Sequence, residues 1–115
     1  MTQILVIDDD QGVRSTIFLL LKELGYDVTT AENGEKGIEL FDSISGIDLV
    51  ITDIRMPGMD GNEVGKYIRN SHKPDTPVIA ITGHQDEIHG GVFDFFLIKP
   101  FKLEALQHVV ESFRR

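Results

Sequence analysis

Short apolar runs alternate along the chain with segments in which apolar residues recur at helical spacing. The apolar runs predict five β-strands, at residues 3–7, 26–30, 48–52, 77–82 and 92–98. The runs ILVI, LVIT and VIAIT are apolar at nearly every position. Such continuous runs are typical of central strands in a parallel sheet that is covered on both faces.

The segments between the strands predict amphipathic helices at residues 13–24, 34–43, 62–70 and 103–113. Gly25 follows the first of them, at a position where a helix commonly ends. Strands that alternate with helices favour right-handed βαβ units. We therefore expect an α/β protein with a doubly wound, five-stranded parallel sheet and helices on both faces.

Composition narrows the class of protein. The 115 residues fit one domain (1–115), and the absence of cysteine excludes disulfides and thiolate metal sites. The net charge of −8 would repel a phosphate backbone, so we expect no direct nucleic-acid partner. There is no signal-peptide pattern and no apolar run near the ~18 residues of a membrane span. These features suit a cytoplasmic protein without a membrane partner.

Polar residues cluster where the predicted strands end. They are Asp8, Asp9 and Asp10 after the first strand, Asp53 after the third, Thr82 after the fourth and Lys99 after the fifth. In a parallel sheet these ends share one edge, so the carboxylates would repel one another unless a cation lay among them. Oxygen ligands suit Mg²⁺, whereas a hydroxyl and an ammonium suit a phosphoryl group. The chemistry indicated is phosphoryl transfer onto a carboxylate. For Asp10, an N-cap role is favoured.

Four motifs stand at these strand ends: VIDDD (6–10), DIRMPGMDG (53–61), ITG (81–83) and IKPF (98–101). Together, and along the whole chain, they resemble the receiver domain of two-component response regulators. The resemblance implies the flavodoxin-like strand order 2-1-3-4-5 and a switch that a sensor histidine kinase or phosphotransfer protein phosphorylates. It also implies that the domain catalyses only its own phosphorylation and dephosphorylation, so it is not otherwise an enzyme. We interpret the chain as a stand-alone receiver.

The resemblance also implies roles for individual residues. Asp53 would be the phosphoacceptor, and Mg²⁺ would be bound by Asp8, Asp9, Asp53 and the backbone carbonyl of Arg55. Thr82 and Lys99 would bind phosphoryl oxygens, and the Lys99–Pro100 bond would be cis. Phe96 matches the switch aromatic, although packing in the core explains an aromatic residue there equally well. Arg55 lies two residues after Asp53, and His84 lies two residues after Thr82. Both side chains are therefore candidates to overhang the phosphate and tune its lifetime.

One stretch departs from the family pattern. Between Thr82 and Lys99 the chain is shorter by about five residues, which is roughly 7–8 Å of helix. The segment HQDEIH (84–89) has a single apolar residue, and Gly90 and Gly91 would end a helix early. We therefore predict that the family's fourth helix is reduced to a turn or loop. Its loss would expose Phe93 or Phe95 to solvent or to contact with a partner protein. The sequence therefore does not predict the output target, and it is compatible with a homodimer.

Two alternatives remain at this point. A pseudo-receiver would have the same fold and would act as a protein-interaction module without being phosphorylated. A haloacid-dehalogenase-like phosphatase would also use a strand-end Asp nucleophile, but it requires a second Asp two residues later, where this chain has Arg55. The four histidines, His72, His84, His89 and His108, match no common zinc-ligand spacing.

Overall fold

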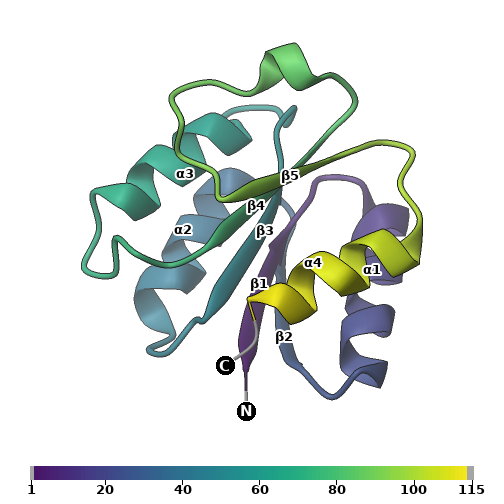
Figure 1. The fold of residues 1–115 in the computed structure, drawn as a ribbon. Coiled ribbons are helices and arrows are strands. Elements are labelled where there is room, and N and C mark those ends of the chain that lie inside the picture. The colour runs from purple at the N-terminus through teal and green to yellow at the C-terminus, as the bar shows by residue number, and fades with distance from the viewer. Residues whose placement is uncertain (1, 114–115) are drawn as a thin grey trace.

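A parallel sheet forms the centre of the molecule (Figure 1). The structure is a computed structural model that describes residues 2–113. Within that range the sheet order is β2-β1-β3-β4-β5, which confirms the predicted topology. The strands are β1 (Gln3–Ile7), β2 (Asp27–Ala31), β3 (Leu49–Asp53), β4 (Val78–Thr82) and β5 (Phe95–Ile98).

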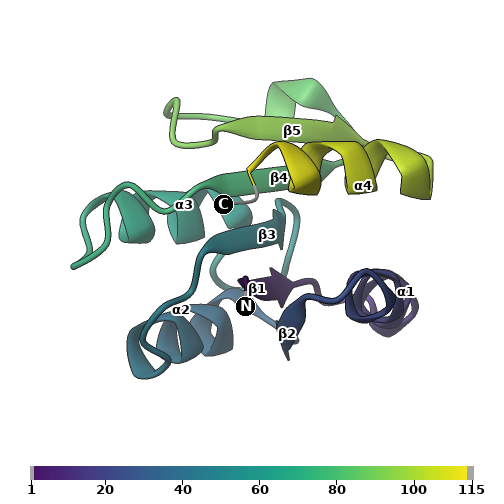
Figure 2. The same ribbon diagram turned by 60° about the horizontal axis from the view of Figure 1, so that its bottom comes forward.

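Helices cover both faces of the sheet, as Figure 2 shows in a view turned by 60°. Helices α1 (Gln11–Glu23) and α4 (Leu103–Ser112) pack on one face, and α2 (Gly34–Ser43) and α3 (Gly61–Arg69) pack on the other. The predicted helices are confirmed, with ends that differ by one or two residues. Within residues 2–113, every helix is too short or too polar to cross a bilayer.

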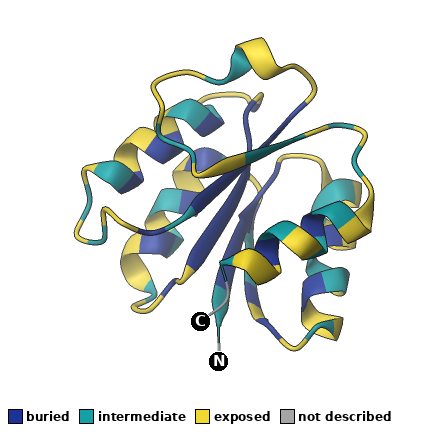
Figure 3. Cartoon of the chain, in the orientation of Figure 1, coloured by how far each residue is buried: buried dark blue, intermediate teal, exposed yellow. Residues whose placement is uncertain are grey.

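The core is divided by the sheet into two clusters. Along β1, Ile4 and Val6 contact the α1 and α4 side, whereas Leu5 and Ile7 contact the α2 and α3 side. All residues of β3 and β4 are buried (Figure 3). This burial on both faces explains why their sequences are continuously apolar rather than alternating.

Side-chain caps start helices α1 and α3, which follow β1 and β3. The Asp10 carboxylate accepts a hydrogen bond from the backbone N–H of Val13 at 3.0 Å, which confirms its predicted N-cap role. Asp60 and Glu63 form a reciprocal capping box at the start of α3. These caps fix where the chain turns after β1 and β3, and so fix the loops that carry the strand-end residues.

The stretch between β4 and β5 contains only a three-residue 3₁₀-helix, η1 (Gln85–Glu87). The predicted loss of the family's fourth helix is therefore confirmed; α4 is the helix after β5. The prediction that β5 begins at residue 92 was wrong, because Val92 and Phe93 leave the sheet and pack over Gly65 of α3. Phe93 is thus partly buried, whereas Phe95 is 47% exposed.

A test of this architecture concerns Gly61, the first residue of α3. A Cβ atom there would lie 2.3 Å from the backbone oxygen of Asp53 and 2.8 Å from Cα of Ile54. Because backbone atoms would have to move, Gly61→Ala should lower the free energy of unfolding by about 1–3 kcal/mol in urea denaturation. Gly83→Ala is the control, since its Cβ would meet nothing within 4 Å. Equal stability of the two variants would contradict the close contact between α3 and β3.

Candidate functional site

Three carboxylates meet at the carboxyl edge of the sheet. Asp53 is the last residue of β3, and Asp8 and Asp9 directly follow β1. One oxygen from each lies within 4.8 Å of the others. The N–H of Ile54 donates to Oδ1 of Asp53 at 2.9 Å, and the N–H of Asp10 donates to Oδ1 of Asp8 at 2.9 Å. Each buried carboxylate is thus oriented by the backbone that follows it.

Lys99 brings a positive charge from the end of β5 to this cluster. Its Nζ lies 3.3 Å from Oδ2 of Asp53 and 4.0 Å from Oδ2 of Asp8. The backbone N–H of Lys99 donates to the carbonyl of Thr82 at 2.8 Å, which joins the ends of β4 and β5. The Lys99–Pro100 peptide bond is cis, as the family resemblance implied.

Burial dominates the electrostatics of the site. Asp8 is 1% exposed, and its burial raises its pKa from 3.8 to about 6, against the opposing effects of the Asp10 N–H and the Lys99 charge. Burial also raises the pKa of Asp53, while the charge and hydrogen bond of Lys99 act in the opposite direction. One ammonium therefore offsets the desolvation of these two acids only in part.

The cluster fits a hard divalent cation. Asp8 is buried, and its Oδ2 has no hydrogen-bond partner among the described residues. A buried carboxylate oxygen without a hydrogen bond, beside two further carboxylates, is a donor set that Mg²⁺ favours. The side chain of Arg55 does not contribute to this set, because it is 80% exposed and forms an ion pair with Glu87.

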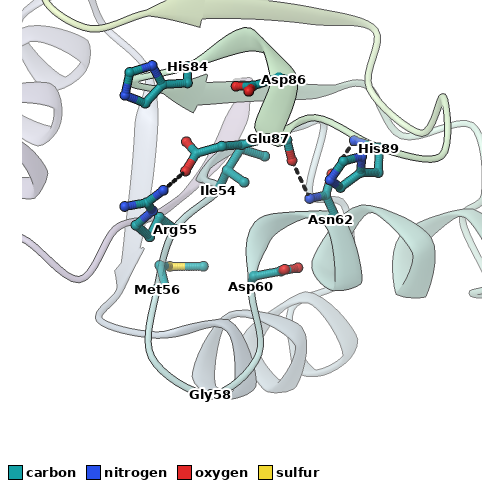
Figure 4. Close-up of a pocket in the computed structure, with 10 residues that line it drawn as sticks. All are labelled: Ile54, Arg55, Met56, Gly58, Asp60, Asn62, His84, Asp86, Glu87 and His89. Carbon is teal, nitrogen blue, oxygen red and sulfur yellow. Dashed lines mark hydrogen bonds and ion pairs between the residues drawn. The ribbon is translucent and has the colours of Figure 1, made fainter.

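Thr82 is buried at the end of β4, but its hydroxyl is already engaged. Its Oγ1 lies 2.5 Å from Oε1 of Glu87, and the N–H of His84 donates to the same Oγ1 at 3.2 Å. The other carboxylate oxygen of Glu87 pairs with Arg55 (Figure 4). The hydrogen bond from Thr82, followed by the contacts with Arg55, lowers the pKa of Glu87.

Glu87 was missed by sequence reasoning. It lies in a three-residue turn without periodicity, so its pattern does not distinguish it from the neighbouring acid Asp86. The two remaining predicted residues, His84 and Phe96, differ in their surroundings. His84 is exposed and lines an open hollow together with Arg55 and Glu87, whereas Phe96 is half-buried in β5.

The fold and the strand-end cluster define a class of α/β protein with an acidic site at one edge of its sheet. Residues 4–111 match the family model of the response regulator receiver domain. The chain therefore belongs to this family, and the haloacid-dehalogenase alternative is not favoured.

Individual proteins of known sequence or structure are also similar to this chain. The probable transcriptional regulator ycf27 of Cyanidium caldarium is 35% identical over 117 residues, which cover 97% of this chain and 46% of that protein. The chain thus spans less than half the length of this relative. The structure of TrrA from Thermotoga maritima with Mg²⁺-BeF is similar with a TM-score of 0.90 and 36% identity, over 99% of this chain and 100% of TrrA. One chain in the structure of the histidine kinase ThkA in complex with TrrA also matches, with a TM-score of 0.87 and 36% identity, over 100% of this chain and 100% of that chain.

The raised pKa of Asp8 predicts how stability depends on pH without metal. Because the folded protein holds this proton up to about pH 6 and the unfolded chain loses it near 3.8, the free energy of unfolding should fall as pH rises between these values. Asp8→Asn cannot ionise, so it should be more stable than wild type at pH 7, by up to about 3 kcal/mol.

Urea denaturation at several pH values in EDTA measures this effect. Asp75→Asn is the matched control, since Asp75 is exposed in the loop before β4, at the opposite edge of the sheet. If Asp8→Asn were less stable than wild type at pH 7, the burial of an uncompensated charge at Asp8 would be contradicted.

Proposed function

We propose that this chain is a phosphorylation-activated signalling switch that accepts a phosphoryl group from a histidine kinase on Asp53 in a Mg²⁺-dependent reaction. The observation that carries the proposal is the position of Asp53. It is a buried carboxylate at a strand end, 3.3 Å from an ammonium and beside two acids from a neighbouring strand. The match to a kinase–TrrA complex supports a kinase as the donor.

In the transfer step, a carboxylate oxygen of Asp53 attacks phosphorus. A new O–P bond forms, and the N–P bond of the phosphohistidine breaks with its electron pair left on the imidazole nitrogen. The Ile54 N–H holds Oδ1 of Asp53, whereas Oδ2 faces Lys99, which can then pair with a phosphoryl oxygen. The ammonium offsets part of the charge of about −1.5 to −2 that the phosphoryl group adds.

Asp8, Asp9, Asp53 and the backbone carbonyl of Arg55 would hold Mg²⁺. When bound, the ion would neutralise the carboxylates and charge on the phosphoryl oxygens. The raised pKa values of Asp8 and Asp53 give a reason for this need, because burial disfavours the ionised form of each acid and a bound cation would offset that cost.

The response would pass through Thr82 and Phe96. Thr82 would donate its hydroxyl to a phosphoryl oxygen, and Phe96 on the neighbouring strand would move inward to fill the space that Thr82 leaves. Arg55 and His84, which line the hollow beside the site, would tune the lifetime of the phosphoryl group. The resulting change of surface would alter protein contacts, as a local charge change that biases a two-state element.

The direct test is incubation with Mg²⁺ and acetyl phosphate, followed by intact-mass and peptide mass spectrometry. Wild type and Asp75→Asn should gain one phosphoryl group, on Asp53, whereas Asp53→Asn should gain none because its amide is not a nucleophile. An unmodified wild type would favour the pseudo-receiver alternative. Modification of Asp53→Asn to the same extent would place the phosphoacceptor elsewhere.

A second test concerns the metal. Mg²⁺ at about 100 times its dissociation constant should raise the free energy of unfolding of wild type at pH 7 by about 2.7 kcal/mol. Asp9→Asn removes one exposed ligand of the cluster and should shift this response to higher Mg²⁺ concentration. Asp75→Asn should respond as wild type does. A stability of wild type that is independent of Mg²⁺, when Ca²⁺ and Mn²⁺ are equally without effect, would contradict the cation site.

A further inference from the structure

The carboxylate of Glu87 uses both of its oxygens to bind the side chains around the phosphoacceptor. Oε1 accepts a hydrogen bond from the hydroxyl of Thr82, with 2.5 Å between the two oxygens, and Oε2 pairs with Arg55. The Glu87 side chain is only 18% exposed in this arrangement, although η1 itself contributes no buried residue. Figure 4 shows Glu87 reaching down from η1 toward Arg55, while Asp86 beside it makes no such contact.

A phosphoryl group on Asp53 would need the same proton. Asp53 pairs with Ile81 in the sheet register, so Thr82 is the next residue along the adjacent strand. The hydroxyl of Thr82 carries a single proton, and its acceptors in the structure are Oε1 of Glu87 at 2.5 Å and, more distant, the carbonyl of His84 at 3.1 Å. Donation to a phosphoryl oxygen would therefore break the hydrogen bond to Glu87. In addition, the negative phosphoryl group would repel the Glu87 carboxylate as long as that carboxylate stays hydrogen-bonded to Thr82.

We propose that Glu87 is an internal anion that latches the segment 83–91 onto the unphosphorylated site, and that the phosphoryl group on Asp53 displaces it. This inference rests on the proposed function, since it requires phosphorylation of Asp53. Glu87 is a positioning residue: it acts through Thr82 and Arg55 and touches no reacting atom. Its displacement converts a change of charge at Asp53 into movement of η1.

The remaining contacts of the segment suit such a release. The carbonyl of Glu87 accepts from the Asn62 side chain at 2.7 Å, and the N–H of His89 donates to the same side chain at 2.8 Å. These polar contacts hold the far end of η1 on α3. Gly90 and Gly91 follow at φ of 81° and 61°, values that other residues rarely adopt. When the Glu87 side chain leaves Thr82 and Arg55, η1 can therefore move on the Gly83 side while the contacts with Asn62 hold its other end.

The experiment compares Glu87→Ala and Glu87→Gln with the matched control Asp86→Ala, which removes an adjacent acid of the same turn. Binding of beryllofluoride with Mg²⁺ is followed by the NMR signals of backbone amides. Glu87→Ala should bind beryllofluoride about fivefold or more tightly than wild type, because the competing anion is gone. Glu87→Gln, which keeps an oxygen acceptor but no charge, should be intermediate, and Asp86→Ala should match wild type.

A second readout needs no phosphoryl mimic. In the free protein, the His84 and His89 amide signals of Glu87→Ala should move toward their positions in beryllofluoride-bound wild type. Equal affinities and unchanged free-state signals in Glu87→Ala and Asp86→Ala would overturn the latch while wild-type binding upholds the proposed function. Weaker binding by Glu87→Ala would also overturn it, by making Glu87 a holder of the phosphoryl group. Failure of wild type itself to bind or be phosphorylated would overturn both proposals.

Discussion

The structure depends on the burial of two carboxylates, Asp8 and Asp53, against the single ammonium of Lys99. Asp53 ends β3 and Asp8 directly follows the adjacent strand β1, and both side chains are buried, so desolvation makes their ionised forms costly. The acids follow or end β1 and β3, and Lys99 follows β5, which is parallel to them in the same sheet. The order of the strands, rather than any one segment, therefore brings these three side chains together. The remaining excess of negative charge is what a divalent cation would offset, and a phosphoryl group on Asp53 would increase that need by adding negative charge.

Much of this arrangement could be predicted from the sequence. The continuous apolar runs fixed the buried strands, and parallel topology brings residues that follow such strands to one edge of the sheet. Asp8, Asp53 and Lys99 were therefore predictable as neighbours although they are far apart in the chain. The N-cap role of Asp10 was equally accessible, because it depends on a contact three residues away.

The features that could not be predicted lie between β4 and β5, where no periodic pattern constrains the chain. The predicted start of β5 was wrong because Val92 and Phe93 are residue types common in strands. In the structure they pack instead against α3, at Gly65, where the absence of a side chain leaves room for them. The contacts of Glu87 with Thr82 and Arg55 depend on how η1 is oriented relative to the sheet. Such contacts follow from the path of a loop in space, which local propensity does not determine.

The uneven burial of the sheet has a consequence for its internal dynamics. Strands β1, β3 and β4 are enclosed, whereas β5 is an edge strand in which Phe95 and Ile98 remain 47% and 39% exposed. Local opening costs less where fewer apolar contacts are lost, so hydrogen exchange should be faster in β5 than in the middle strands. Lys99 directly follows this edge strand, so local opening of β5 would loosen the ammonium from the two acids.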